Sequence, residues 1–211
     1  MSVINQQTAD LLSQLKSGTY GTSGDVIFHT LYDQVVVGGA NILQQEFFTT
    51  PIGAIVGSNP KSKAWTNLRD TGKFPAGQAF IAEKMRLGFF NKSATTSAFV
   101  SQTNLFYQVL QNCNVEIQIV GREFEAQFAG SLFIPSVAVV GDSAVTVNNV
   151  RVGDYFSNAS VKLITPVIFS ELVSFKVVMT FDPSMSANLG TLNTAGCMFH
   201  WDLLGMLARK K

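Results

Sequence analysis

Alternating side chains over residues 173–181 constrain the fold of this chain more than any other feature. The segment reads VSFKVVMTF, so Val173, Phe175, Val177, Met179 and Phe181 share one parity. Because successive side chains of a β-strand point to opposite faces of a sheet, a period of two over nine residues predicts a strand with one face on a core. Similar runs recur from about residue 31 to the C-terminus, which predicts an all-β chain.

The other strand candidates are spaced regularly along the chain. They lie at 31–37, 42–49, 80–90, 115–119, 124–128, 132–140, 145–152, 161–169, 172–181 and 198–207. Turn residues separate them at Gly141-Asp142, Gly153-Asp154, Pro166 and Asp182-Pro183. About eight to ten short strands at this spacing are typical of a β-sandwich or jelly roll.

Two stretches follow a helical pattern instead. Apolar and small residues at 99, 100, 103, 106, 107 and 110 form a helical stripe, which predicts a helical insertion at about 95–112 laid on a sheet. Near the N-terminus, Thr8 can cap a short helix that ends at Gly18. We therefore expect an N-terminal arm over residues 1–30 and one domain over residues 31–211.

The composition is poor in charge. Charged residues make up 14% of the chain, against about 25% in soluble domains. Uncharged polar groups replace them, with 59 Ser, Thr, Asn and Gln residues, and the net charge is +1. Such a surface is weakly protected against self-association, so we expect much of it to be buried against other copies. A neutral monomer is the alternative.

Cysteine usage and the first residues bear on localisation. Cys113 and Cys197 are the only cysteines and form no zinc motif, so free and mostly buried thiols are expected. The opening MSVINQQTADLL has neither the basic nor the apolar region of a signal peptide, and no apolar run reaches the ~18 residues of a membrane span. These features predict a soluble product of the cytoplasm in which it is made.

Catalytic chemistry finds little support in the sequence. The two histidines, His29 and His200, stand in no recognisable motif, and Cys197 with His200 lacks a second pair of metal ligands. Glu123 and Glu125 share a strand face that is expected to be the solvent side rather than a glycosidase pair. No phosphate loop of the form G-x-x-x-x-G-K-[ST] occurs. We predict no catalytic, cofactor or metal site, and no enzyme activity.

The order of segments is similar to that of a known family. The chain contains in succession TNLRDTGKFPAGQAFIAEKMRLGFF, a helical insertion, NVEIQIVGREFEAQFAGSLFIP, TPVIFSELVSFKVVMTFDP and a terminal HWDLLGMLARK with a Leu203-x-Gly205 step. This succession, over about residues 42–209, resembles the jelly-roll capsid proteins of small tailless icosahedral bacteriophages. The resemblance implies a single eight-stranded jelly roll, because the chain is too short for two.

The resemblance also implies a function. It predicts a structural capsid protein, located in the virion after synthesis in the host cytoplasm, that self-assembles into an icosahedral shell around the genome. Its partners would be other copies of itself, in trimers or pentamers, and other capsid proteins, and the family has no catalytic residues or cofactor. The genome type and a membrane beneath the shell stay open.

Within this interpretation, basic residues are the candidate contacts with packaged nucleic acid or with acidic neighbours. Residues 61–92 carry a local charge of +5, and the chain ends in three basic residues. The candidates are Lys61, Lys63, Arg69, Lys73, Arg209, Lys210 and Lys211.

Two other classes of protein remain as alternatives. A sandwich-fold binding module for carbohydrate or a receptor would expose aromatic platforms, for which Trp65, Tyr155 and Phe156 are the candidates. An all-β enzyme would need His29 or His200 to take part in its chemistry.

Overall fold

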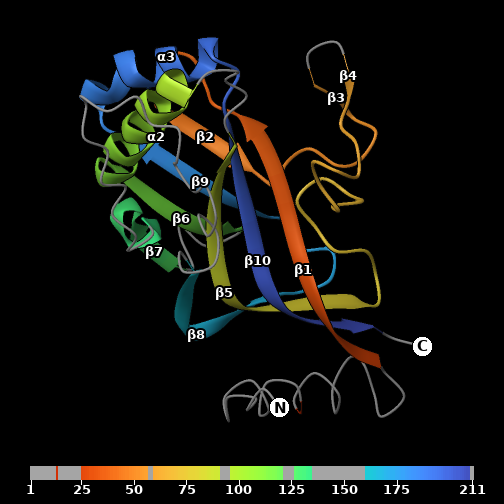
Figure 1. The fold of residues 1–211 in the computed structure, drawn as a ribbon. Coiled ribbons are helices and arrows are strands. Elements are labelled where there is room, and N and C mark those ends of the chain that lie inside the picture. Colours follow the sequence, from red (N-terminus) through yellow and green to blue (C-terminus); the bar gives the residue numbers. More distant parts are fainter. Residues whose placement is uncertain are drawn as a thin grey trace.

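The computed structural model describes residues 13, 25–56, 59–90, 96–120, 126–134 and 160–209. Within these residues the chain is mostly β, in antiparallel sheets with two helices (Figure 1). The predicted N-terminal helix lies outside the described residues except for Ser13, which is helical. None of the helices in the described ranges combines the length and apolarity that a membrane crossing needs.

Four long strands form sheet A, in the spatial order β1-β10-β5-β8. Their bounds are Asp25–Val36 (β1), Met198–Arg209 (β10), Gln78–Phe90 (β5) and Ser160–Phe169 (β8). β1 pairs with β10 over its whole length and starts before the predicted Leu31. The sequence gives no alternation there because side chains such as Phe28, which is 66% exposed, do not face the core.

Four shorter strands form sheet B, in the order β2-β9-β6-β7. Their bounds are Gln44–Phe47 (β2), Phe175–Phe181 (β9), Cys113–Ile119 (β6) and Ala126–Ala129 (β7). The predicted alternation in β9 is confirmed, because Phe175, Val177, Met179 and Phe181 are all buried. The strand begins after the predicted Leu172, whose φ of 60° places it in a turn.

Aromatic side chains join the two sheets across one core. Phe47 of sheet B meets Trp201 of sheet A at 6.1 Å between ring centroids, edge to face. The rings of Phe169 and Phe175 lie 4.3 Å apart, also across the sheets. Such pairs contribute about 0.5–1.5 kcal/mol each beyond the burial of their area, so the aromatic cluster fixes how the sheets face each other.

Both helices lie beside each other at one side of the core (Figure 1). The helix α2, Thr96–Gln111, confirms the predicted insertion, and Phe106 stacks on Phe89 of β5 at 4.3 Å. The second helix, α3 at Ser186–Thr194, was not predicted. It follows a short 3-10 turn, η2 at Pro183–Met185, in which the Asp182 carboxylate accepts from the Ser184 amide at 2.8 Å.

One predicted strand is wrong in its described part. The prediction placed a strand at 132–140, but Gly130–Phe133 form the 3-10 turn η1. This turn carries Phe133 into the core, where its ring lies 4.8 Å from that of Trp201. Packing of one aromatic ring therefore outweighs the extended preference of the segment. Residues 135–140, the predicted strand at 145–152 and residues 124 and 125 of the predicted strand at 124–128 lie outside the described residues.

The connection from β2 to β5 runs along the outer edge of β1 (Figure 1). We call residues 51–56 and 59–77, the described part of this connection, the β1-edge segment. It contains the two-residue strands β3, Ile55–Val56, and β4, Asn59–Pro60, which pair with each other. The Gln34 amide of β1 donates to the Trp65 carbonyl at 2.7 Å, and the Thr66 hydroxyl donates to the Tyr32 carbonyl at 3.1 Å. These bonds satisfy and cover a strand edge that would otherwise be open to pairing with another chain.

A glycine allows the two central strands of sheet A to approach closely. The pairing of β10 with β5 shifts in register between Leu204 and Gly205. A Cβ atom at position 205 would lie 1.8 Å from the Ile81 carbonyl oxygen, which is part of the backbone and cannot move independently. The predicted Leu-x-Gly step thus marks a position where a side chain does not fit.

We expect Gly205→Ala to lower the free energy of unfolding by roughly 1–3 kcal/mol or more, because β10 and β5 must separate to admit the methyl group. Urea unfolding followed by tryptophan fluorescence measures the change. Gly39→Ala is the matched control, since the nearest atom to its Cβ would be Asn193 Oδ1 at 4.0 Å. Equal losses for the two variants would contradict the close-approach argument.

Candidate functional site

Four of the predicted contact residues line one pocket. Lys63, Arg69, Lys73 and Arg209 surround a cavity of about 330 Å³, which we call the basic pocket. Its other lining residues are polar or apolar, and none is acidic: His29, Leu31, Tyr32, Ile52, Asn67, Leu68, Phe74, Pro75, Gln78 and Leu207. The pocket therefore gathers positive charge without a carboxylate to balance it.

The pocket joins parts of the chain that are far apart in sequence. The β1-edge segment supplies Lys63, Arg69 and Lys73, while Arg209 is the last residue of β10. Antiparallel pairing sets Arg209 opposite Asp25 at the start of β1, so the end of the chain meets the strand that carries His29. The sequence predicted the residues, but the pairing of β1 with β10 brings them together.

Lys61 has a different role from the other predicted cations. Its ammonium lies 2.5 Å from Asp33 Oδ1, and its side chain is 2% exposed. A buried and paired ammonium is not available to nucleic acid or to a neighbouring protein, so Lys61 does not belong to the contact set. Lys210 and Lys211 lie outside the described residues.

The Asp33 carboxylate links three parts of the chain. One oxygen binds Lys61, and the other, Oδ2, accepts a hydrogen bond from the Phe48 amide at 2.7 Å. Phe48 has a φ of 64°. Burial raises the pKa of Asp33. The positive charge of Lys61 and the hydrogen bonds from Lys61, Phe48 and Thr66 lower this pKa, but they offset only part of that rise. The charged state of Asp33 therefore depends on Lys61.

Asn67 fixes the polar wall of the basic pocket. Its Oδ1 accepts from the Tyr32 amide at 2.9 Å, and its Nδ2 donates to the Thr30 carbonyl at 2.6 Å. This orientation turns Nδ2 toward His29 Nε2, 3.4 Å away. Burial, and then the positive charge of Arg209, lower the pKa of His29, so this ring is neutral at neutral pH.

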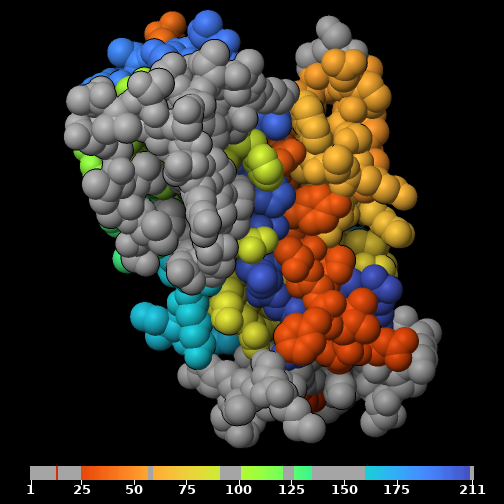
Figure 2. Space-filling model, viewed as in Figure 1, coloured from red at the N-terminus to blue at the C-terminus, as the bar shows by residue number. Residues whose placement is uncertain are grey.

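A polar row crosses the outer face of sheet A, where β1, β10 and β5 form the strip of surface seen in Figure 2. Asp202 of β10 accepts from Arg86 Nε at 2.8 Å and lies 3.0 Å from His200 Nε2. The ring of Tyr32 stacks on His200 with centroids 6.1 Å apart. Burial acts to raise the pKa of Asp202, but the hydrogen bonds and charges of His200 and Arg86 outweigh it and lower the pKa.

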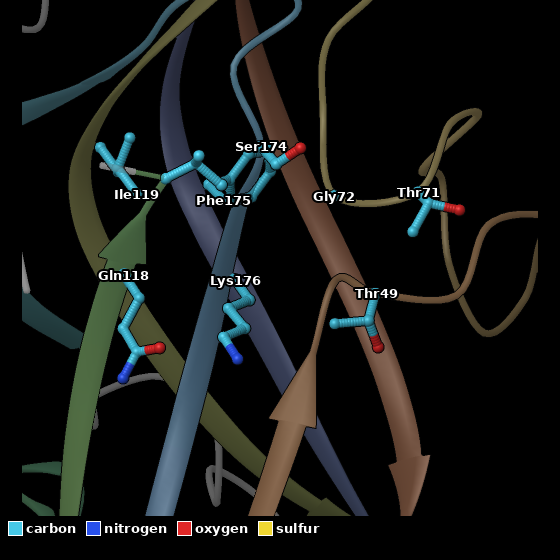
Figure 3. A pocket seen from close by; sticks show the side chains of 9 residues that line it. Thr49, Thr71, Gly72, Gln118, Ile119, Ser174, Phe175 and Lys176 are labelled. Carbon is cyan, nitrogen blue, oxygen red and sulfur yellow. The ribbon is translucent and has the colours of Figure 1, made fainter. Parts of the chain in front are cut away.

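A second hollow, of about 280 Å³, lies where β6 and β9 meet the turn at Gly72 (Figure 3). The Phe175 amide donates to the Gly72 carbonyl at 2.6 Å, which holds the β1-edge segment against β9. The one charged side chain that lines the hollow, Lys176, forms an ion pair with Glu46. This hollow therefore offers mainly hydroxyl, amide and apolar groups, and is a weaker candidate for a charged ligand than the basic pocket.

The remaining candidates from the sequence do not form a site. Cys113 and Cys197 are both free thiols, as predicted, and burial raises the pKa of Cys113 to about 12. Glu123 and Glu125 lie outside the described residues. Across the described part of the chain, no group of three or more His, Cys, Asp and Glu side chains is placed to hold a metal ion.

Several residues of the basic pocket are not among those predicted from the sequence. His29 is a candidate there only for enzyme chemistry, and Asn67 and Gln78 are not singled out. The sequence did contain a signal for an anion site, because residues 66–78 combine turn residues with Arg69 and Lys73. Polar turn residues next to cations are a common way to build an anion site. No family model, curated protein or solved structure matches the chain.

Removing one partner of the Asp33–Lys61 pair should be strongly destabilising. We expect Lys61→Met to lower the free energy of unfolding by about 3–5 kcal/mol, because it leaves Asp33 buried without its counter-charge. The double variant Asp33→Asn/Lys61→Met should lose much less free energy of unfolding than the sum of the losses of the two single variants. Lys63→Met, on the same segment but exposed, is the control and should change stability by less than about 0.5 kcal/mol. Strictly additive losses in the double variant would argue against a coupled pair.

Asp202 should contribute stability that depends on pH. Because its pKa is lowered on folding from 3.8, its contribution is fully present above that value and is lost as the pH falls through the folded pKa. We expect the wild type to lose stability below about pH 4 relative to Asp202→Asn. Urea unfolding between pH 2 and pH 6 measures the difference between the two proteins. If the difference in free energy of unfolding between the two proteins stayed constant from pH 2 to pH 6, protonation of Asp202 would not be coupled to stability.

Proposed function

We propose that the chain is a single jelly roll and serves as a structural capsid subunit that assembles with copies of itself. The order of strand pairing carries this proposal. Among the eight strands of sheets A and B, the first pairs with the last, β1 with β10, and the second with the seventh, β2 with β9. The third pairs with the sixth, β5 with β8, and the fourth with the fifth, β6 with β7.

This nested pairing is what a long antiparallel hairpin produces when it is wrapped into two sheets, which is the plan of a jelly roll. The pairings of β10 with β5 and of β9 with β6 then join the nested pairs into two four-stranded sheets. The short β3–β4 pair belongs to the connection and not to either sheet. Jelly rolls are the common fold of viral capsid subunits, and also of lectins and cupins.

Exposed apolar side chains favour assembly among these possibilities. Ile164 of β8 is 94% exposed, Ile55 of β3 76%, Val120 after β6 71% and Phe28 of β1 66%. These residues come from separate parts of the chain: two strands of sheet A, the turn after β6 of sheet B, and the β1-edge segment. An apolar contact at several separate places is what a subunit with several neighbours needs, and many weak contacts in a closed shell give a stable particle.

The outer face of sheet B is suited to contacts that do not bury unpaired charge. Glu116 accepts from the side-chain amides of Asn114 at 2.8 Å and Gln118 at 2.9 Å. Beside it, Lys176 pairs with Glu46. Because these charges already have partners, a neighbouring subunit can approach the face with a smaller desolvation cost than it would meet at isolated ions.

The test is whether purified protein assembles through these residues. We expect sedimentation velocity and negative-stain microscopy to show trimers, pentamers or closed shells. Ile164→Asp and Ile55→Asp should each shift the protein toward smaller species without changing its circular dichroism, because a carboxylate would be buried at the contact. Thr165→Asp places the same charge at the adjacent exposed position of β8 and is the matched control.

The competing hypothesis is a sandwich-fold binding module that acts as a monomer. A monomeric wild type at every concentration, together with no effect of either apolar variant, would overturn the capsid proposal. Binding of the same monomeric protein to glycans on an array would then support the binding module.

A further inference from the structure

The cations of the described chain fall into two groups. Lys61, Arg86 and Lys176 each lie within 4 Å of a carboxylate and help to hold the fold together. Within the described ranges the other six have no such partner: Lys63, Arg69, Lys73, Lys84, Lys162 and Arg209. Four of these six line the basic pocket. Positive charge without a structural role is therefore concentrated at one place.

This concentration of positive charge favours the binding of an anion. Like charges in one cavity repel each other, and no acidic residue is among those that line it. The cations extend from half-buried Lys73 to exposed Lys63, Arg69 and Arg209. Gln78 adds a side-chain amide to the wall, which can donate to oxygen atoms, whereas the Asn67 amide is held by Thr30 and faces His29. The pocket thus presents charge and hydrogen-bond donors together.

We propose that the basic pocket binds phosphate groups, and that the ligand it takes is the sugar-phosphate backbone of a single-stranded nucleic acid. Four separate cations on one cavity of about 330 Å³ fit successive phosphates of a chain better than one small tetrahedral anion. Lysine and arginine contacts to phosphate carry no base specificity, so binding should be independent of sequence.

His29 provides a reporter inside the site. Its ring is neutral at neutral pH, because burial and the charge of Arg209 lower its pKa. A bound phosphate brings negative charge beside the ring and favours its protonated form. The pKa of His29 should therefore rise when the pocket is filled, and this rise would not follow from a contact elsewhere on the surface.

The inference goes beyond the proposed function, because phosphate binding by one subunit does not require assembly. The binding experiment is therefore done on the Ile164→Asp protein if the wild type assembles, and on the wild type if it does not. Failure of assembly and failure of phosphate binding can then be told apart.

The experiment measures the affinity for a labelled eight-nucleotide oligo(dT) by fluorescence anisotropy over a salt series. Three to four phosphate contacts predict a slope of about −2 to −3 in log K against log salt. Lys73→Gln with Arg209→Gln should weaken binding roughly tenfold or more and make the slope less negative by about 1.4. Lys84→Gln with Lys162→Gln removes the same charge from sheet A outside the pocket and should change the slope much less. Thermal unfolding checks that both double variants fold.

The second measurement follows the His29 ring by NMR between pH 4 and pH 8. Addition of oligo(dT) should raise its pKa, and inorganic phosphate should raise it at higher concentration, in the parent protein but not in the Lys73→Gln/Arg209→Gln variant. A response to inorganic phosphate alone, with no pocket-dependent binding of oligo(dT), would overturn the assignment to nucleic acid. An unchanged His29 pKa with both ligands, or equal losses in the two double variants, would overturn the phosphate site itself.

Discussion

The carboxylate of Asp33 is the group on which the arrangement around β1 depends. It is fully buried, with the Lys61 ammonium on one oxygen and the Phe48 amide on the other. Removing a carboxylate from water is costly, and here one opposite charge and directed hydrogen bonds offset part of the cost. Since Lys61 belongs to the β1-edge segment and Phe48 follows β2, a single side chain of β1 fixes both against sheet A.

This attachment has consequences at the edge of the sheet and in the basic pocket. The β1-edge segment covers the outer edge of β1 through the Gln34–Trp65 hydrogen bond, and the same segment carries Lys63, Arg69 and Lys73. An open strand edge is a site of uncontrolled pairing with other chains. Protection of the edge and construction of the pocket therefore depend on the same segment, which the buried ion pair helps to hold.

The parts of the fold that the sequence predicts well are those where one face meets the core and the other meets solvent. β9 alternates for this reason, and α2 shows a helical stripe for the same reason. The η1 turn was missed because its conformation follows from the place that Phe133 takes beside Trp201, which is a tertiary contact. The start of η2, the turn that leads into α3, could have been found, because Asp182 followed by Pro183 is a helix-start signal as well as a turn signal.

The candidate site shows where local patterns stop being informative. Lys61 and Lys63 look alike in the sequence, and they differ because Lys61 pairs with an acid 28 positions earlier. That acid was itself a clue, since an aspartate at an inward position of an apolar strand needs a partner. Arg209 joins the pocket only through the pairing of β10 with β1. Because gathered like charges do not stabilise a fold, their common position is better explained by an anion than by packing.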